Sequence, residues 1–351
     1  MPNGVSLFSG AGIAEIFLQS IGINIVVANE IIKERAELYN HQYPSSNMIC
    51  GDILDENVYT SILRETPDHL DFLLASPPCQ GMSVAGKNRF LEQMICDPRN
   101  SLILKVVDFI HKKHPEFVFI ENVPMFLKVE IVSNNKIKKV VDILKDEFSE
   151  EYNIDAQIFD AQYYGIPQRR KRAIVRMWKL GKTWNNPQKC PPITLREAIG
   201  NLPSIEAGEK SDIKWHFARH HSPIHIECMK HTPTGHSAFE NDIYYPRNAK
   251  GERVRGYNTT YRRINWDEPA PTITMRNDAI SSQLNVHPGR LQDDGTYSDA
   301  RVLTPLELMI LNSIPRDWNI PDDTPEILIR KVIGESIPPL LVKKIVEQIV
   351  F

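Results

Sequence analysis

The chain has 351 residues, of which 42% are hydrophobic and 24% are charged, and its formal net charge at pH 7 is −3. These are the values of an ordinary globular protein that is large enough for two lobes. They exclude a chain that attracts nucleic acid over its whole surface, so a phosphate-binding surface has to be local. No apolar run is long enough to cross a bilayer, and Met1–Gly4 lacks the basic start of a secretory signal.

The five cysteines are widely separated, and none belongs to a Cys-x-x-Cys pair. They are Cys50, Cys79, Cys96, Cys190 and Cys228. An odd, scattered set argues against a disulfide framework and indicates a reducing compartment. We therefore expect a cytoplasmic protein.

The chain begins with a strand, a glycine turn and a helix. Val5–Phe8 is predicted to be a buried strand, Ser9–Gly12 the turn, and about Ile13–Ile21 an apolar-periodic helix. Such a turn brings bare backbone close to a ligand and directs a helix N-terminus at it. Glycines also make plain turns, and Glu15 occupies the position of the third glycine in dinucleotide-binding motifs.

Acidic residues follow the second and third predicted strands, Ile23–Ala28 and Met48–Cys50. Glu30 is placed to accept hydrogen bonds from ribose hydroxyls, or else it is a surface acid before a helix that starts near Lys33. Asp52 could accept a hydrogen bond from the exocyclic amine of adenine, or it could cap a helix. Together with the glycine turn, the two acids favour a ligand that contains adenosine.

The stretch Ser76–Ser83 is the most distinctive of the chain. It follows the apolar strand Phe72–Ala75, and its two prolines fix φ and lack an N–H, so they stop the strand and stiffen the turn. Cys79 is thereby held at the carboxyl edge of the sheet, where open α/β folds place their ligands. The alternative is a plain proline turn that contains a small apolar residue.

A second reactive group follows one strand further along. The polar loop Val84–Asn100 and an amphipathic helix over Ser101–Lys113 lead to the buried strand Phe117–Ile120, which ends at Glu121. A loop of this length in a compact domain is usually functional or mobile. A partly desolvated carboxyl has a raised pKa and can carry a proton near neutrality. Glu121 could otherwise cap a helix or lie on the surface.

The next predicted elements are a helix over about Asn135–Phe148 and strands over Tyr152–Asp160 and Ala173–Met177. Between the two strands lie four consecutive cations, residues 169–172. Such a run is usually a solvated patch, but its place between two strands directs some of these cations into the cleft. Arg170 or Arg172 near Cys79 would favour the thiolate.

Regular patterns fade after Trp178, where proline, histidine, asparagine and glycine become more frequent. We expect a catalytic, cofactor-binding domain over residues 1–180, a smaller domain over 181–300, and a C-terminal segment over 301–351 that returns to the first domain. The helices predicted in that segment are Pro305–Leu311, with Thr304 and Glu307 as a capping box, and Ile337–Val350.

The second lobe contains six histidines near Cys228 and a stretch of basic residues and tyrosines. The histidines are His216, His220, His221, His225, His231 and His236. Their spacing fits no standard zinc pattern, so contacts with a substrate are favoured over a metal site. The stretch comprises Tyr244, Tyr245, Arg247, Lys250, Arg253, Arg255, Tyr257, Tyr261, Arg262 and Arg263. It suits phosphate contacts with aromatic packing, or else it is an ordinary mixed surface.

Taken together, these motifs resemble those of the DNA (cytosine-5)-methyltransferase family over almost the whole chain. The matching segments are Phe8–Gly12, Glu30, Gly51–Ile53, Pro78–Gln80, Glu121–Val123, Gln168–Arg172, Arg263 with Glu268–Thr274, and Gly334–Ser336. Their common order and plausible spacing carry the resemblance. It implies an α/β fold, a Rossmann-like sheet of S-adenosylmethionine-dependent methyltransferases with a second, smaller target-recognition domain.

The resemblance also implies a mechanism and its catalytic residues. The target cytosine leaves the duplex, because carbon 6 cannot be reached while the base is stacked. Cys79 adds to carbon 6, Glu121 protonates ring nitrogen 3, and Arg172 holds the ring oxygen, with Arg170 counted among the catalytic residues. Carbon 5 then takes the methyl group, a base such as water removes its proton, and the cysteine leaves.

The same resemblance implies binding residues and partners. S-adenosylmethionine would be bound by Phe8, Gly10, Gly12, Glu30, Asp52, Ile53, Pro78 and Ser336. Gln80, Ser83 and Lys87 would lie near DNA phosphates, and Arg263 would support the loops that face the bases. The partner is double-stranded DNA, with a cognate restriction endonuclease acting separately. We expect a monomer in the cytoplasm of a bacterial cell or phage-infected host, with no metal and no membrane association.

Two features depart from the family pattern. Glu335 stands where the family usually has asparagine, and it could weaken cofactor binding or pair with the cofactor's ammonium group. Ser76–Pro78 half resembles the motif of amino-methyltransferases, which continues with an aromatic residue, but Cys79 and Glu121 favour carbon 5. An impaired DNA-binding relative and an RNA methyltransferase remain alternatives.

Overall fold

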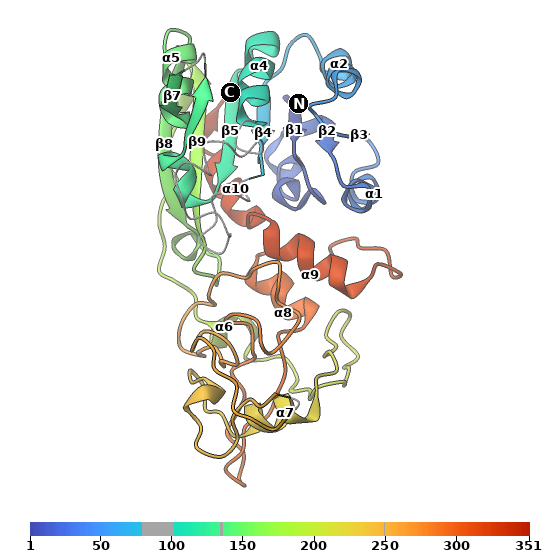
Figure 1. Ribbon diagram of the computed structural model, residues 1–351. Coiled ribbons are helices and arrows are strands. Elements are labelled where there is room, and N and C mark those ends of the chain that lie inside the picture. Colours follow the sequence, from blue (N-terminus) through green and yellow to red (C-terminus); the bar gives the residue numbers. More distant parts are fainter. Residues whose placement is uncertain (79–101, 134–135, 249) are drawn as a thin grey trace.

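The computed structural model describes residues 1–78, 102–133, 136–248 and 250–351. A seven-stranded sheet forms the upper part of the molecule in Figure 1, with strand order β3-β2-β1-β4-β5-β9-β8. Its strands are β1 (Asn3–Leu7), β2 (Asn24–Glu30), β3 (Asn47–Cys50), β4 (Phe72–Ala75), β5 (Phe117–Asn122), β8 (Tyr152–Asp160) and β9 (Lys171–Lys179). The first five are parallel to one another, whereas β9 is antiparallel to both β5 and β8. The start of β9 therefore lies at the carboxyl edge of β4 and β5.

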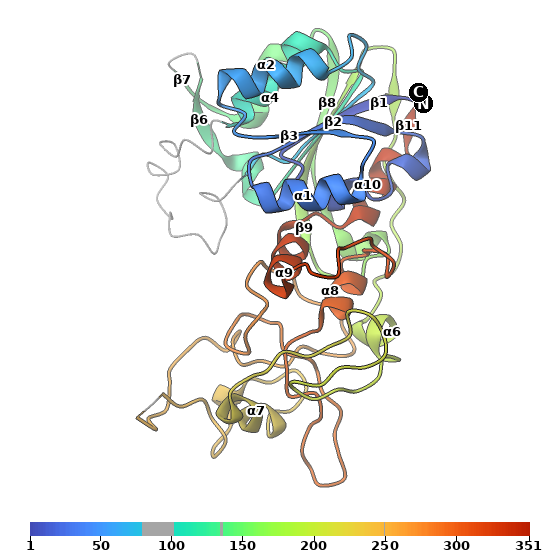
Figure 2. The ribbon, with the colours of Figure 1, turned by 90° about the vertical axis from the view of Figure 1, so that its right-hand side faces the viewer.

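Helices cover both faces of the sheet, as Figure 2 shows. The helices are α1 (Lys33–Gln42), α2 (Glu56–Glu65), α4 (Leu102–Lys113), α5 (Val140–Phe148) and α10 (Pro339–Val346). Apolar side chains of α2, α4 and α5 share one buried cluster with Leu73 and Val118. Those of α1 and α10 share another with Leu74 and Phe119. Neighbouring strand residues point to opposite faces, so the predicted all-apolar strands supply both cores.

The lower part of Figure 1 contains short helices joined by long irregular segments. Its helices are α6 (Leu195–Ile199), α7 (Pro223–Lys230), η6 (Ala238–Glu240), α8 (Pro305–Leu311) and α9 (Glu326–Glu335). One apolar cluster joins α6, α8 and α9 to Ala11 and Ile13 near the glycine turn. A smaller one, which includes Met229 and Val286, lies within the lower part. The division into two domains with boundaries near 180 and 300 stays a prediction.

The predicted helix over Ile13–Ile21 was wrong, because the segment forms two single 3-10 turns, η1 (Ile13–Glu15) and η2 (Gln19–Ile21). Their bonds span three residues, as from the N–H of Leu18 to the carbonyl of Glu15. The segment winds around the Glu15 carboxyl, which is buried and accepts a hydrogen bond from the Tyr39 hydroxyl at 2.6 Å. A partner twenty-four residues away decides this local structure.

Two other predicted helices were too long. Instead of helix from about Asn135, a β-hairpin precedes α5, formed by β6 (Glu130–Ser133) and β7 (Lys136–Lys139), whose β-branched residues favour strands. The helix predicted over Ile337–Val350 starts only at Pro339, since proline suits the first helical position. Its last residues form β11 (Ile349–Val350), which pairs with β10 (Thr183–Trp184). Within the described ranges, no helix combines the length and apolar character that a bilayer crossing requires.

Candidate active site and cofactor site

Three strand ends bring Ser76, Glu121 and Arg172 together. Ser76 follows β4, Glu121 lies near the end of β5, and Arg172 lies at the start of the antiparallel β9. Glu121 is paired in register with Ile174, so Arg172, two residues earlier, is its diagonal neighbour on the same face. The topology thus delivers an acid and a cation to one point of the carboxyl edge, as open α/β sheets do at their ligand sites.

Glu121 and Arg172 form a nearly buried ion pair. The Nε atom of Arg172 lies 2.9 Å from a Glu121 carboxylate oxygen, and the two side chains are 10% and 12% exposed. Burial raises the pKa of Glu121, while Arg172, Arg170 and the Ser76 hydroxyl oppose this rise. Burial also lowers the pKa of Arg172, against the attraction of Glu121. The carboxyl is therefore poised to hold a proton more readily than an exposed glutamate does.

The proline turn is fixed directly to β5. The side-chain amide of Asn122 donates a hydrogen bond to the Pro77 carbonyl at 3.0 Å, and the Ser76 N–H donates to the carbonyl of Leu7 on β1. Pro78 is half-buried beside them. The turn that leads to the predicted nucleophile thus begins within hydrogen-bond reach of the glutamate's own strand. The predicted residues Cys79, Gln80, Ser83 and Lys87 lie outside the described residues.

Arg170 holds two distant segments against the site. Its guanidinium donates to the carbonyls of Ile273 (2.5 Å), Gly334 (2.8 Å) and Ser336 (2.6 Å), and the side chain is fully buried. Among the described residues its Nε has no hydrogen-bond partner. Beside it, the amide of Gln168 donates to Leu311 and Asn312. The geometry places Arg170 as a residue that positions the C-terminal segment, rather than in the ion pair with Glu121.

The glycine turn and Glu30 form one hydrogen-bonded unit. The N–H of Gly10 donates to one Glu30 oxygen at 2.9 Å, and the N–H of Ile32 donates to the other at 2.8 Å. Gly10 has φ +58°, and a side chain there would meet no atom within 4 Å. Phe8 also has a positive φ, 60°, which is rare for an aromatic residue and indicates a functional constraint. Open space beside bare backbone and an oriented carboxylate fits a ribose.

Gly12 is required by side-chain packing, and not because a ligand approaches it. A side chain on it would lie 2.4 Å from the ring of Tyr43, whose hydroxyl donates to the Gly12 carbonyl at 2.8 Å. The Tyr39 ring packs at a tilt against the Tyr43 ring, and its hydroxyl donates a hydrogen bond to Glu15. Burial raises the pKa of Glu15 to about 7. This tyrosine pair and its acid were not predicted, because nothing local in the sequence marks them as partners.

The remaining predicted cofactor residues lie around the same edge. Asp52 is exposed and accepts a hydrogen bond from the Leu54 N–H, while the next residue, Ile53, is buried in the core. The helix cap at this boundary is Asp55 instead, which accepts from two N–H groups of α2. The Ser336 hydroxyl accepts from Asn312 at 2.9 Å and donates to a carbonyl of α9.

Arg263 is completely buried in the lower part. It donates to the carbonyls of Met229, His287, Tyr297 and Asp299. A contact of Arg263 itself with DNA is therefore not available, and its geometry fits a support for the loops around it. On the surface, the guanidinium groups of Arg247 and Arg253 both lie over the Tyr245 ring, at 4.7 and 4.3 Å from its centroid.

The histidines of the second lobe have separate partners. His216 is buried and contacts Thr304 and the Pro203 carbonyl, His225 contacts Tyr261, and His231 and His236 contact Glu227 and Glu240.

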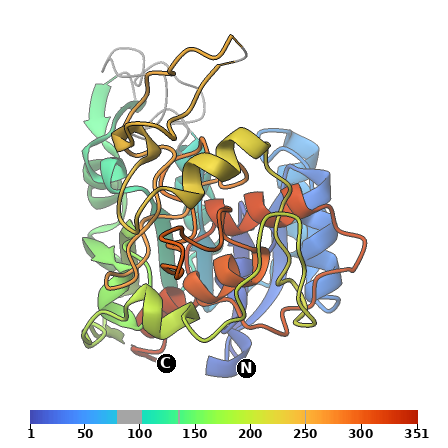
Figure 3. The ribbon, with the colours of Figure 1, turned by 90° about the horizontal axis from the view of Figure 1, so that it is seen from below.

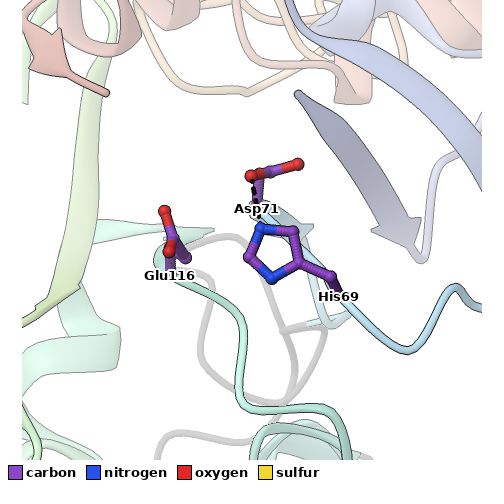
Figure 4. Close-up of side chains that lie close together, drawn as sticks. All are labelled: His69, Asp71 and Glu116. Atoms are coloured by element: carbon purple, nitrogen blue, oxygen red, sulfur yellow. Dashed lines mark hydrogen bonds and ion pairs between the residues drawn. The ribbon is translucent and has the colours of Figure 1, made fainter. Parts of the chain in front are cut away.

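In the described part of the chain, one cluster could offer three metal ligands, His69, Asp71 and Glu116 (Figure 4). It lies at the opposite, amino-terminal edge of β4 and β5. Its carboxylates already bond the Asn3 N–H and Lys182, so it remains outside the site.

Comparisons with known proteins identify the family of the chain. The family of C-5 cytosine-specific DNA methylases matches residues 3–350. The Type II methyltransferase M1.HgaI of Avibacterium volantium is 58% identical over 99% of this chain and 97% of its own length. The Type II methyltransferase M1.HphI of Haemophilus parahaemolyticus is 28% identical, over 98% and 86% of the two chains.

Solved structures show the same fold at low identity. A candidate DNA modification methyltransferase encoded within an Escherichia coli prophage has a TM-score of 0.70 at 20% identity, covering 99% of this chain and 98% of its own. Spodoptera frugiperda DNMT2 has a TM-score of 0.63 at 16% identity, covering 99% of each chain. The fold and the family match together define a methyltransferase. The chain belongs to the C-5 cytosine-specific DNA methylase family and is a DNA (cytosine-5)-methyltransferase of restriction-modification type.

Proposed function

We propose that the protein transfers a methyl group from S-adenosylmethionine to carbon 5 of a cytosine that is flipped out of a specific double-stranded DNA sequence, through a covalent bond to Cys79. The observation that carries this proposal is the buried pair of Glu121 and Arg172, which lies one strand from the proline turn. Cytosine must leave the stack, because carbon 6 faces a neighbouring base in the duplex.

Each residue of the site has its own step in the proposed reaction. The Cys79 thiolate forms a bond to carbon 6, and the electron pair of the ring's double bond is drawn toward ring nitrogen 3. The Glu121 carboxyl donates a hydrogen bond and then its proton to that nitrogen, which its raised pKa supports. Arg172 holds Glu121 in place and has further N–H groups for the ring oxygen. Water removes the carbon 5 proton after methylation, and the bond to Cys79 breaks.

The methyl donor would bind along the glycine turn. Glu30, oriented by two backbone N–H groups, would accept from the ribose hydroxyls, and Gly10 leaves room beside it. Asp52 and Ile53 would contact the adenine, with Phe8, Gly12, Pro78 and Ser336 completing the site. When bound, S-adenosylmethionine supplies an electrophilic methyl group on a sulfonium.

The lower part would select the DNA sequence. Its stacked arginines on Tyr245 suit phosphate contacts, while Gln80, Ser83 and Lys87 would contact phosphates close to the flipped base. Arg263 would act indirectly, by fixing the loops that reach the bases. The Type II name of the relative M1.HgaI supports a cognate endonuclease that acts separately. A monomeric state and a cytoplasmic location complete the proposal.

Bisulfite sequencing tests the proposal directly. Purified protein is incubated with S-adenosylmethionine and a plasmid of mixed sequence, and protected cytosines at one recurring context are expected. The same assay on transcribed RNA of that sequence distinguishes an RNA methyltransferase. DNA binding without any protected cytosine would indicate the impaired relative and contradict the proposal.

A further inference from the structure

Arg35, on α1, lies between two carboxylates that come from opposite ends of the chain. Its guanidinium is 2.6 Å from a Glu335 oxygen at the end of α9, and 3.8 Å from a Glu30 oxygen at the end of β2. All three side chains are largely shielded, with exposed fractions of 19%, 23% and 5% for Arg35, Glu335 and Glu30.

The distances from Arg35 to the two carboxylates correspond to different interactions. A separation of 2.6 Å is a charge-assisted hydrogen bond, whereas 3.8 Å is beyond hydrogen-bond distance. Each Glu30 oxygen already accepts one backbone N–H, from Gly10 or from Ile32. A carboxylate oxygen has a second acceptor position, and the Arg35 guanidinium would occupy it if it moved about 1 Å closer.

We propose that Glu335 is a positioning residue that holds Arg35 away from Glu30, so that the Glu30 carboxylate stays available to the ribose of the methyl donor. The inference rests on the proposed function of Glu30. Glu335 acts through Arg35, and it has no need to touch the cofactor itself.

A restraining role of Glu335 and a purely structural ion pair predict different effects for substitutions of the two partners. If the pair only ties α1 to α9, removal of either partner has the same effect, because both variants lose the same contact. If Glu335 restrains Arg35, then Glu335→Gln releases a cation onto Glu30, whereas Arg35→Ala removes the cation altogether. The second substitution therefore rescues the first.

Isothermal titration with S-adenosylmethionine measures this asymmetry. Glu335→Gln is expected to weaken binding about tenfold, the equivalent of one lost hydrogen bond to a charged group. Arg35→Ala and the double variant are expected to bind within about threefold of the wild type. Glu37→Gln, which removes an exposed carboxylate of the same helix from its pair with Lys33, is the matched control and should change nothing.

Two results have different meanings. If the wild type does not bind S-adenosylmethionine, the proposed function fails. If the wild type binds but both single variants and the double variant weaken binding equally, only the role of Glu335 is overturned. Thermal unfolding of each variant shows whether any loss of binding follows a loss of fold.

The pH dependence gives a second readout. Burial, with a smaller contribution from the Glu30 carboxylate, raises the pKa of Glu335 to about 7 against the opposing effect of Arg35 and Lys331. Below this pH the protonated carboxyl holds Arg35 weakly, so cofactor binding should weaken as the pH falls from 8 to 6. In Glu335→Gln this dependence should disappear, and its persistence would contradict the restraint.

Different observations indicate a second functional surface, the hairpin β6–β7. The hairpin β6–β7 begins nine residues after Glu121 and projects from the same side of the molecule as the loop around residue 250, as Figures 2 and 3 both show. Lys136 and Lys139 are exposed on it, Lys128 is exposed just before it, and Lys138 is partly exposed and pairs with Asp146. Glu130 is the single acid among the described residues from 128 to 139.

We infer that the hairpin is a DNA-backbone contact outside the recognised sequence, with Lys136 and Lys138 facing phosphates. The loop near residue 250, which carries the arginines over Tyr245, projects from this same side (Figures 2 and 3), so a duplex bound to the lower part could reach both. The cross-strand pair Val132 and Ile137 is exposed on the opposite face of the ribbon.

Binding to a duplex of unrelated sequence, measured over a range of salt concentrations, tests this contact. Lys136→Ala/Lys138→Ala is expected to reduce the salt slope by about 1 to 2, because each phosphate contact contributes roughly 0.9. Lys343→Ala/Lys344→Ala on α10 is the matched control, since Lys344 pairs with Glu347 as Lys138 pairs with Asp146. An unchanged slope in the hairpin variant would overturn the inference.

Discussion

The two halves of the molecule position polar groups by opposite means. At the sheet edge, apolar strands form the core, and Glu121 and Arg172 meet in an ion pair because they lie near the ends of neighbouring strands. In the lower part, few regular elements exist between residues 204 and 301, and buried arginines bind loop carbonyls instead. In the sheet half, the strand topology alone brings the polar side chains together. In the lower half, buried polar side chains are needed to stabilise the loops.

The catalytic edge is expected to be the most sensitive point. Glu121→Gln cannot deliver a proton to the base, so methyl transfer should fall by about 10²- to 10⁴-fold with little change in folding. The measurement is the single-turnover rate with tritiated donor. Glu116→Gln, at the other end of the same strand, is the control and should retain its rate. Equal losses in both variants would mean that the strand, rather than its carboxyl edge, matters.

The lower part should lose stability, rather than chemistry, when its buried arginine is removed. Arg263→Met leaves several buried carbonyls without donors, which should cost about 3–5 kcal/mol. We expect a lower thermal midpoint and lost DNA binding, with S-adenosylmethionine binding retained. The adjacent, partly exposed Arg262 pairs with Glu240, and Arg262→Met should cost less than about 1 kcal/mol.

If Arg263→Met abolishes cofactor binding as well, the two halves fold as one unit. That result would contradict the division into domains near residue 180.

The buried acid under the glycine turn predicts a pH effect on stability. The pKa of Glu15 is raised to about 7 in the folded state, so the folded protein binds more protons than the unfolded chain between about pH 4.5 and 7. Stability should therefore fall as the pH rises through this window, by up to about 3 kcal/mol. Chemical denaturation at pH 5 and 7.5 should show a smaller difference in Glu15→Gln. An equal difference in both proteins would assign the effect to other groups.

The smallest expected effect belongs to Ser76. Its hydroxyl opposes the raised pKa of Glu121, so Ser76→Ala should raise that pKa further. If protonated Glu121 is needed, the alkaline limb of the pH–rate profile should move to higher pH by less than about one unit. A shift to lower pH would mean that the ionised form is the active one.

Much of the sheet could be predicted from the sequence, since the strands before Ser76 and Glu121 are short apolar runs with local signals. Both residues were placed at the correct edge for that reason. The pairing of Arg35 with Glu335 could not be predicted, because its partners are 300 residues apart and neither sits in an apolar pattern. The contacts of the tyrosines around Gly12 could not be predicted for the same reason.

Strand β7 was predicted as the start of a helix from about Asn135, although the β-branched residues of the hairpin favour strands. The loops of the lower part gave no period at all, and their order comes from buried arginines such as Arg263, whose carbonyl partners carry no sequence signature. Sequence reasoning therefore works where apolar periodicity sets the structure, and it fails where long-range polar contacts do.

The most direct measurement is covalent trapping on DNA that contains 5-fluorocytosine at the methylated position. In the presence of S-adenosylmethionine, the wild type should form a complex with this DNA that survives denaturation, and Cys79→Ala should form none. A methylating wild type that leaves no such complex, or a complex that persists in Cys79→Ala, would contradict the attack of Cys79 on carbon 6.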